Sequence, residues 1–442
     1  EKAKSVLSKM EFKSEVSEGQ WNVESAINAI SSDDLALAEA GCEFLESAIR
    51  DHQNYLTIEY IRIASKQFTN DSILYMRFIK LMCKIASMGE DEFRLSEKCG
   101  AVQDIVALCT TDDILVQMNA VQLLISLAET HCGLEYMSTG DVITWLVTTS
   151  CGKLLENSNM AFQGPDPLIS AEALRVLGTV FVKAAEKHFD LLNKMHASIV
   201  THFLHRIQHY FEEGSEEEKL AALGALADFA INSISTLQLV METSARTSAS
   251  LVGAWMDLLI NTRSELVSAV LQSVAVVLSQ PDDVFIANTL CHSAHQSIPE
   301  SEHREKITSL KRLLLGKIGA ARNISTMGHL LKLATQPVEG PRFAAVNLMR
   351  AMAEQPTGWG LQQLFQYTVS PSLEGNFPLY LQERLTEYSK EGKDWKFALI
   401  LAVAHNPNRG HLPAEVNEKI ELMVQQGAYY LPPHADVQTM EA

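Results

Sequence analysis

Apolar residues recur along this chain in one short pattern: two apolar positions, two variable ones, another apolar position and then a small residue. On an α-helix these positions form a single broad stripe, and the small residue lets a neighbouring helix approach closely. The copies end at Ala86, Ala128, Gly178, Ala230, Ala275 and Ala353. The first five are separated by 42, 50, 52 and 45 residues, and the last gap of 78 is close to two periods.

A helical period of about 40–50 residues is typical of HEAT and armadillo repeats. One such repeat cannot bury its own stripe, so neighbouring repeats must stack. No stretch alternates with period two for long enough to predict a sheet. We therefore predict an all-α protein with an armadillo/HEAT-like α-solenoid fold.

Helix punctuation supports the repeats. Asp166-Pro167 predicts an N-cap followed by proline at the first helical position, and Ser215 with Glu218 predicts a capping box. Pro341, after Gly340, is expected to open another helix. We expect Gly133 to end a helix, residues 134–137 to form a short one, and Gly140-Asp141 to start the next, which is an armadillo-like rhythm.

Four regions follow from this pattern. Residues 1–35 are expected to form an N-terminal partial repeat or cap, and residues 36–355 the armadillo/HEAT-like repeats. Residues 356–433 are expected to form C-terminal capping helices, and residues 434–442 a disordered tail. The chain begins at Glu1 without a methionine, so we expect some N-terminal sequence to be missing.

Composition changes this picture in two ways. The net charge of −18 disfavours nucleic acid and anionic membranes and favours a partner with a basic surface, although many cytosolic proteins are acidic without such a role. The seven cysteines are odd in number and irregularly spaced, which fits reduced thiols in a cytoplasmic protein, or a nuclear one.

Motifs for covalent chemistry are missing from the sequence: there is no phosphate-binding loop, dinucleotide fingerprint, nucleophile elbow or HExxH. His202, His205 and His209 fall on one side of a helix and could bind zinc or copper. A solvated face is the favoured interpretation, because zinc sites usually draw ligands from more than one element. We expect no enzyme activity, no cofactor and no metal.

A basic segment, residues 304–322, stands out in this acidic chain. It could serve nuclear import or contact an acidic surface. The alternative is an exposed helix face whose charges pair with neighbouring repeats.

Three segments resemble the proteasome non-ATPase regulatory subunit 5 family. They are Val116 to Leu146 with its run Ser126-Leu127-Ala128-Glu129-Thr130-His131, Ala344-Ala345 to Pro356, and Gly427-Ala428-Tyr429-Tyr430-Leu431-Pro432-Pro433. The resemblance covers roughly residues 70–435 and departs at the N-terminus, where this chain is shorter by a repeat or more.

This resemblance implies an assembly chaperone for the base of the proteasome 19S regulatory particle. Such a protein binds the C-terminal domain of one ring ATPase, escorts it with its base subcomplex, and is absent from the mature proteasome. Armadillo proteins line their groove with the last helix of each unit, which makes Asp104, Trp145, Arg206 and Asp257 candidate partner-binding residues. The alternative is a generic armadillo-type adaptor. An import adaptor would repeat a Trp–Asn pair, and the five tryptophans here lack a regularly paired Asn.

Overall fold

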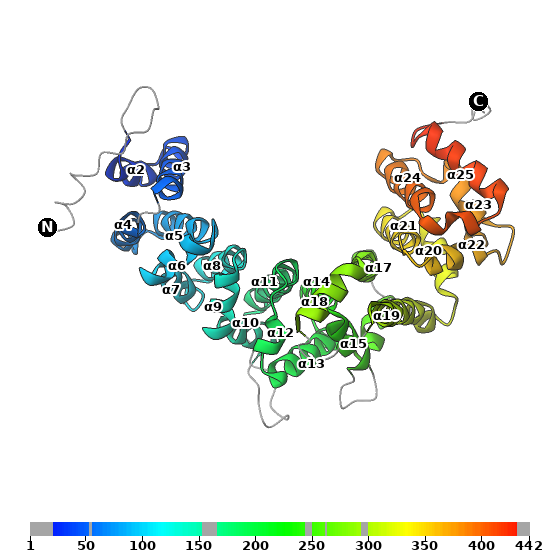
Figure 1. Ribbon diagram of the computed structural model, residues 1–442, viewed down its shortest axis with the longest axis horizontal. Coiled ribbons are helices and arrows are strands. Elements are labelled where there is room, and N and C mark those ends of the chain that lie inside the picture. The colour runs from blue at the N-terminus through cyan, green and yellow to red at the C-terminus, as the bar shows by residue number, and fades with distance from the viewer. Residues whose placement is uncertain are drawn as a thin grey trace. The chain divides into compact units, whose positions relative to one another are not determined.

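A computed structural model describes residues 21–52, 55–152, 166–243, 250–260, 263–292 and 299–430. Within these ranges the regular elements are all helical, and Thr368 and Asn376 form an isolated antiparallel bridge. Successive groups of helices stack along the chain (Figure 1), so the predicted armadillo/HEAT-like α-solenoid is confirmed. The chain divides into two compact units, residues 1–200 (unit 1) and residues 201–442 (unit 2).

Unit 1 is built on a stack of long helices with shorter helices on one side. Its elements are α2 (Val23–Ile30), α3 (Leu35–His52), α4 (Tyr55–Ser65), η1 (Lys66–Phe68), α5 (Ser72–Ala86), α6 (Glu90–Lys98), α7 (Ala101–Leu108), α8 (Ile114–Leu127), α9 (His131–Thr139), α10 (Val142–Cys151), α11 (Pro167–Glu186) and α12 (Leu191–Lys194). The long helices α3, α5, α8 and α11 pack in that order (Figure 1).

The long helices of unit 1 run in the same direction. Lys84, near the end of α5, lies 2.7 Å from Glu46 of α3, and Lys183, near the end of α11, lies 3.0 Å from Glu129 just after α8. Cys83 Sγ of α5 also lies 3.1 Å from the carbonyl oxygen of Leu123, near the end of α8. Because these three contacts join the C-terminal halves of neighbouring helices, the N-terminal ends of all four helices lie along one edge of the stack.

Unit 2 repeats the plan with a second stack, α14, α17, α21 and α24. Its elements are most of α13 (Ala197–Glu213), then α14 (Glu216–Ala230), α15 (Ile234–Glu242), α16 (Leu251–Asp257), α17 (Ser264–Ser279), α18 (Asp282–His292), α19 (Glu300–Arg322), α20 (Thr326–Ala334), α21 (Glu339–Ala353), α22 (Trp359–Gln366), η2 (Leu373–Gly375), α23 (Phe377–Gln382), η3 (Arg384–Thr386), α24 (Lys390–His405), η4 (Pro407–His411) and α25 (Ala414–Gln426). The apolar stripes found in the sequence are buried in both stacks; Leu124 and Leu348, for example, are fully buried.

The predicted helix starts are largely confirmed. Asp166 caps α11 with Pro167 at the first position, and Ser215 and Glu218 form the capping box of α14. Helix α21 starts at Glu339, so Pro341 lies in its first turn and does not open it.

The prediction for Gly133 was wrong, and the reason is steric. The preceding helix already ends at Leu127, and Gly133 is the third residue of α9, where its N–H donates to Thr130 Oγ1 at 3.0 Å. A Cβ atom at Gly133 would lie 1.8 Å from the carbonyl oxygen of Leu127. The glycine is needed for a tight corner between a long helix and the next short one, and Gly360 plays the same part beside Met352.

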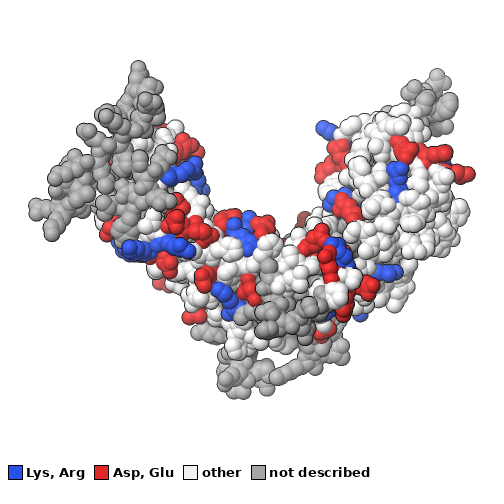
Figure 2. All heavy atoms as spheres, viewed as in Figure 1, with Lys and Arg blue, Asp and Glu red and all other residues white. Residues whose placement is uncertain are grey.

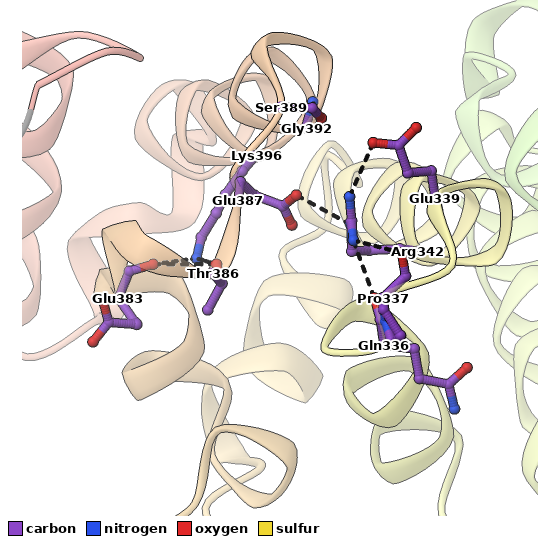
Figure 3. Close-up of polar contacts among 10 residues, drawn as sticks. All are labelled: Gln336, Pro337, Glu339, Arg342, Glu383, Thr386, Glu387, Ser389, Gly392 and Lys396. Atoms are coloured by element: carbon purple, nitrogen blue, oxygen red, sulfur yellow. Dashed lines mark hydrogen bonds and ion pairs between the residues drawn. The ribbon is translucent and has the colours of Figure 1, made fainter. Parts of the chain in front are cut away.

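A buried polar cluster joins α21 to the C-terminal helices (Figure 3). We call Arg342, Glu387 and Lys396 the Arg342 cluster. Arg342 Nε lies 3.1 Å from Glu387 Oε2, and an Arg342 Nη1 donates to the carbonyl oxygen of Gln336 at 3.1 Å. Lys396 donates to the carbonyl oxygen of Glu383 and, at 2.6 Å, to Thr386 Oγ1. The cluster therefore holds α24 and η3 against α21.

Several predictions lie partly or wholly outside the described residues. The disordered tail at 434–442 and most of the N-terminal cap are among them, and the proposed region boundaries stay predictions. Six cysteines can be followed, and none of these forms a disulfide. Burial raises the pKa of both Cys83 and Cys109 to about 12, so these thiols stay protonated at neutral pH.

Among the described helices, none is by itself both long and apolar enough to cross a bilayer. Helices α17 and α18 pass that test of length and composition only as a pair, and the chain bends by 68° between them.

Candidate protein-binding surfaces

Exposed apolar side chains stand at the starts of the four stacked helices of unit 1. We call Leu35, Ile73, Leu115 and Leu168 the helix-start row; their exposed fractions are 70%, 69%, 73% and 50%. Ile73, Leu115 and Leu168 each occupy the second position of their helix, and Leu35 the first position of α3. Because these helix starts share one edge, the four side chains form a row along unit 1.

An aspartate precedes each member of the row. The four are Asp34, Asp71, Asp113 and Asp166. The carboxylate of Asp71 accepts from the N–H of Ile73 at 3.1 Å, and those of Asp113 and Asp166 accept from Leu115 and Leu168 at 3.0 and 2.9 Å. Capping explains the aspartates, because the first N–H groups of a helix need an acceptor. It does not explain the exposed leucines and isoleucine.

A single exposed leucine is ordinary on a protein surface, whereas a row of them on successive repeats is a candidate interaction surface. The second positions of the stacked helices in unit 2 provide the contrast. They are Glu217 in α14, Glu265 in α17, Gly340 in α21 and Glu391 in α24. The apolar row is thus a property of unit 1 and not of the repeat itself.

A groove of about 480 Å³ opens beside the row, between α5 and α8. Ile73, Met76, Leu115 and Val116 supply its apolar part, and polar side chains, Lys80 among them, border it. A shallow groove with an apolar part and a polar border suits contact with another polypeptide more than enclosure of a small molecule.

Two of the predicted partner-binding residues, Asp104 and Trp145, lie in unit 1 on α7 and α10, outside the long-helix stack. Asp104 Oδ2 lies 2.5 Å from Arg62 Nε and 3.6 Å from Lys66 Nζ. The hydrogen bond that Arg62 donates to Asp104 raises the pKa of Arg62. Asp104 therefore already links α7 to α4, and Trp145 is half-buried.

The other two, Arg206 and Asp257, lie in unit 2 on α13 and α16, also outside the stack. The Arg206 guanidinium lies over the ring of Tyr210 at 4.7 Å, and Asp257 is exposed. Their role as partner contacts stays a prediction.

The sequence did carry a signal for the helix-start row that we missed: an aspartate followed two residues later by Ile or Leu, as in Asp71-Ser72-Ile73.

The histidines on α13 do not converge with other ligands. His205 is exposed, and His209 Nδ1 lies 3.9 Å from Glu213. Burial is the main cause that lowers the pKa of His209. In the parts of the chain that the structure describes, no three His, Cys, Asp or Glu side chains are grouped to hold a metal ion.

The basic segment of the sequence forms α19, and its charges divide into two groups. Arg304 pairs with Asp283 and Glu300, and Lys311 is buried against Asp282, with Nζ 2.8 Å from Oδ1. Burial lowers the pKa of Lys311. These pairs match the interpretation of a helix face paired with its neighbours. Arg312 differs, because it is exposed and no carboxylate of the described residues lies within 4 Å of it.

Three hollows of unit 2 adjoin one another, and we call them together the Arg312 groove. They have volumes of about 450, 490 and 690 Å³ and run between α19, α20, α22 and η4. Arg312 lines two of them, and Gln362 and Gln366 of α22 also line two. The guanidinium lies 5.8 Å from the ring of Trp359.

Acidic and basic side chains are interspersed over the visible face of each unit (Figure 2), so neither unit presents a field of one sign there. Extended rows and shallow grooves on stacked helices are surfaces for other polypeptides. Fold and surfaces together define an armadillo/HEAT-like scaffold of the kind that binds proteins.

The family follows from sequence comparison. A family model described as proteasome non-ATPase 26S subunit matches residues 16–293, and the chain belongs to this family. It is 23% identical over 409 residues to the 26S proteasome non-ATPase regulatory subunit 5 of Homo sapiens, covering 90% of this chain and 68% of that protein. The Bos taurus protein of the same name is 22% identical, with 94% and 71% covered.

Solved structures that this chain resembles include engineered and designed proteins. A crystal structure of an engineered protein matches 91% of this chain and 98% of its own, with a TM-score of 0.41 and 18% identity. A designed armadillo repeat protein matches 66% of this chain and 99% of its own, with a TM-score of 0.36 and 15% identity.

Proposed function

We propose that this protein is an assembly chaperone for the base of the proteasome regulatory particle. It binds the C-terminal domain of one ring ATPase subunit, accompanies the base subcomplex and leaves before the proteasome is complete. Membership of the non-ATPase subunit family supports this role, as do two relatives named as regulatory subunit 5 that align over nine-tenths of the chain.

The helix-start row is the observation that carries the proposal. All four of its residues lie inside the segment that the family model matches. Apolar side chains flanked by capping aspartates suit a partner surface on which apolar residues are bordered by Lys or Arg. The net charge of −18 adds long-range attraction for such a surface.

A chaperone must also release its client. A shallow row with exposed charges at its border gives rapid association, and later contacts in the growing complex can displace it. We assign the protein no catalytic role of its own. We place its action in the cytoplasm, and in the nucleus as a second site.

The test is recovery of base ATPases from cell extract on the tagged full-length chain, read by mass spectrometry. We expect ring ATPases to be recovered without the mature core particle. Replacing three row residues together, Ile73→Glu, Leu115→Glu and Leu168→Glu, should reduce ATPase recovery at least about tenfold, because it removes apolar contact and adds charge repulsion.

A matched control places the same change on exposed leucines of unit 2, namely Leu239→Glu, Leu379→Glu and Leu422→Glu. This control should recover ATPases like the unaltered chain. Full recovery by the row variant would remove the row from the interface. Recovery of unrelated proteins in place of ATPases by the unaltered chain would favour a generic armadillo adaptor.

A further inference from the structure

We propose that the Arg312 groove is a second binding site, which holds an extended acidic peptide segment of a partner protein. This site lies in unit 2, beyond the segment that the family model matches, and does not depend on the helix-start row. The side chains that line the groove are the reason for proposing an acidic peptide as the ligand.

Trp359 and Arg312 form the recognition pair. Trp359 lines the groove and is only 6% exposed, and its buried indole N–H has no hydrogen-bond partner among the described residues. A buried N–H without an acceptor costs free energy, and a peptide carbonyl or carboxylate would satisfy it. The planar Arg312 guanidinium above the ring is suited to bind a carboxylate through two parallel hydrogen bonds.

Glutamine amides supply the rest of the site. Gln362 and Gln366 are exposed one helical turn apart, and Gln363 lies beside them on the groove wall. None of the three amides makes a side-chain hydrogen bond to another described residue. One turn of helix rises about 5.4 Å, close to the two-residue repeat of about 6.6 Å of an extended strand. Amides at this spacing can donate to and accept from alternate peptide units of the strand.

The charge of the groove selects acidic segments. Its walls carry Arg304, Arg312 and His411 against a single carboxylate, Glu305. Arg304, Thr308 and Arg312 are spaced four residues apart and so line one face of α19. Arg304 is already neutralised by Asp283 and Glu300, which leaves Arg312 as the cation available to a ligand.

The experiment measures binding of a fluorescein-labelled peptide of alternating glutamate and serine to the full chain by fluorescence anisotropy. Its counterpart with glutamine for every glutamate is the ligand control. We expect the glutamate peptide to bind more tightly. Arg312→Gln should weaken binding at least about tenfold, because it removes the charged hydrogen-bond donor of the peptide carboxylate.

Three further variants sharpen the result. Lys332→Gln removes an exposed cation of α20 outside the groove and should leave binding unchanged. Arg312→Lys should restore part of the affinity, and Trp359→Phe, which keeps the ring and loses the N–H, should weaken it several-fold. Equal binding of the glutamine peptide, an unaffected Arg312→Gln variant, or equally effective competition by inorganic phosphate would overturn the proposal.

Discussion

At the scale of single residues, the Arg342 cluster shows how burial sets chemistry in this protein. Glu387 and Lys396 are both buried, and the ring of Tyr380 lies 4.2 Å from the Lys396 ammonium. Burial lowers the pKa of Lys396 to about 7 and raises those of Glu387 and Tyr380. Lys396 therefore titrates near neutral pH.

Lys396 makes stability depend on pH in a defined direction. Between about pH 7 and 10.5 the unfolded chain holds a proton that the folded chain has lost. The free energy of unfolding should therefore rise with pH from about 7 to 9, by at most about 1.4 kcal/mol per pH unit from this group. Urea unfolding of Lys396→Met across this range should lack that rise.

The control for this measurement is Lys390→Met, on the exposed first residue of the same helix. It should keep the full pH dependence. A Lys396→Met protein with the slope of the unaltered chain would assign the titration to another group.

At the scale of elements, short-range corners and caps hold successive repeats in register. The Glu90 carboxylate, at the start of α6, accepts from the backbone N–H groups of His131 and Cys132 at 2.7 and 2.8 Å. Burial alone would raise the pKa of Glu90, but these hydrogen bonds outweigh it and the pKa is lowered. Glu90 of α6 thus caps α9, the short helix at the corresponding place in the next repeat.

The glycine corner between α8 and α9 gives an element-scale prediction. Gly133→Ala should lower the free energy of unfolding by at least about 2 kcal/mol, because the new Cβ would overlap the Leu127 carbonyl and force the helices apart. Thermal and urea unfolding measure this change.

Gly224→Ala is the matched substitution in α14, where an added Cβ meets no atom within 4 Å. It should stabilise the protein by about 0.5–1 kcal/mol, since alanine favours helix interiors. If both substitutions had the same effect, the corner would tolerate a side chain, and the close approach of Gly133 to the Leu127 carbonyl would be disproved.

At the scale of the whole molecule, stability is divided between two units whose repeats contact their neighbours. In solenoids the free energy is approximately a sum over repeats and their interfaces. Damage to one unit should therefore stay largely within it.

Leu124→Ala tests this division. Leu124 is fully buried in α8, so its truncation should cost about 2–5 kcal/mol. Hydrogen exchange should accelerate in α5, α8 and α11 and stay unchanged in α21 and α24. Leu348→Ala in α21 should produce the reverse pattern, whereas faster exchange throughout the chain in either variant would show a single cooperative unit.

The sequence by itself determined the fold class, because a stripe such as Leu123-Leu124 to Ala128 can be buried only against a similar neighbouring helix. It also determined the caps at Asp166 and Ser215, which depend on residues a few positions apart. It identified the family through three segments in register. These features are local or periodic, so they can be predicted from the amino-acid sequence alone.

Only the tertiary structure decided which faces are free. Asp104 is hydrogen-bonded to Arg62, 42 residues away. A glycine is required at position 133 because the folded corner brings the Leu127 carbonyl too close for a Cβ atom. The helix-start row exists because parallel stacking aligns the starts of separate helices. The Arg312 groove exists because α19, α22 and η4 meet across about a hundred residues of chain. Exposure and long-range pairing depend on packing between repeats, and a linear pattern does not contain that information.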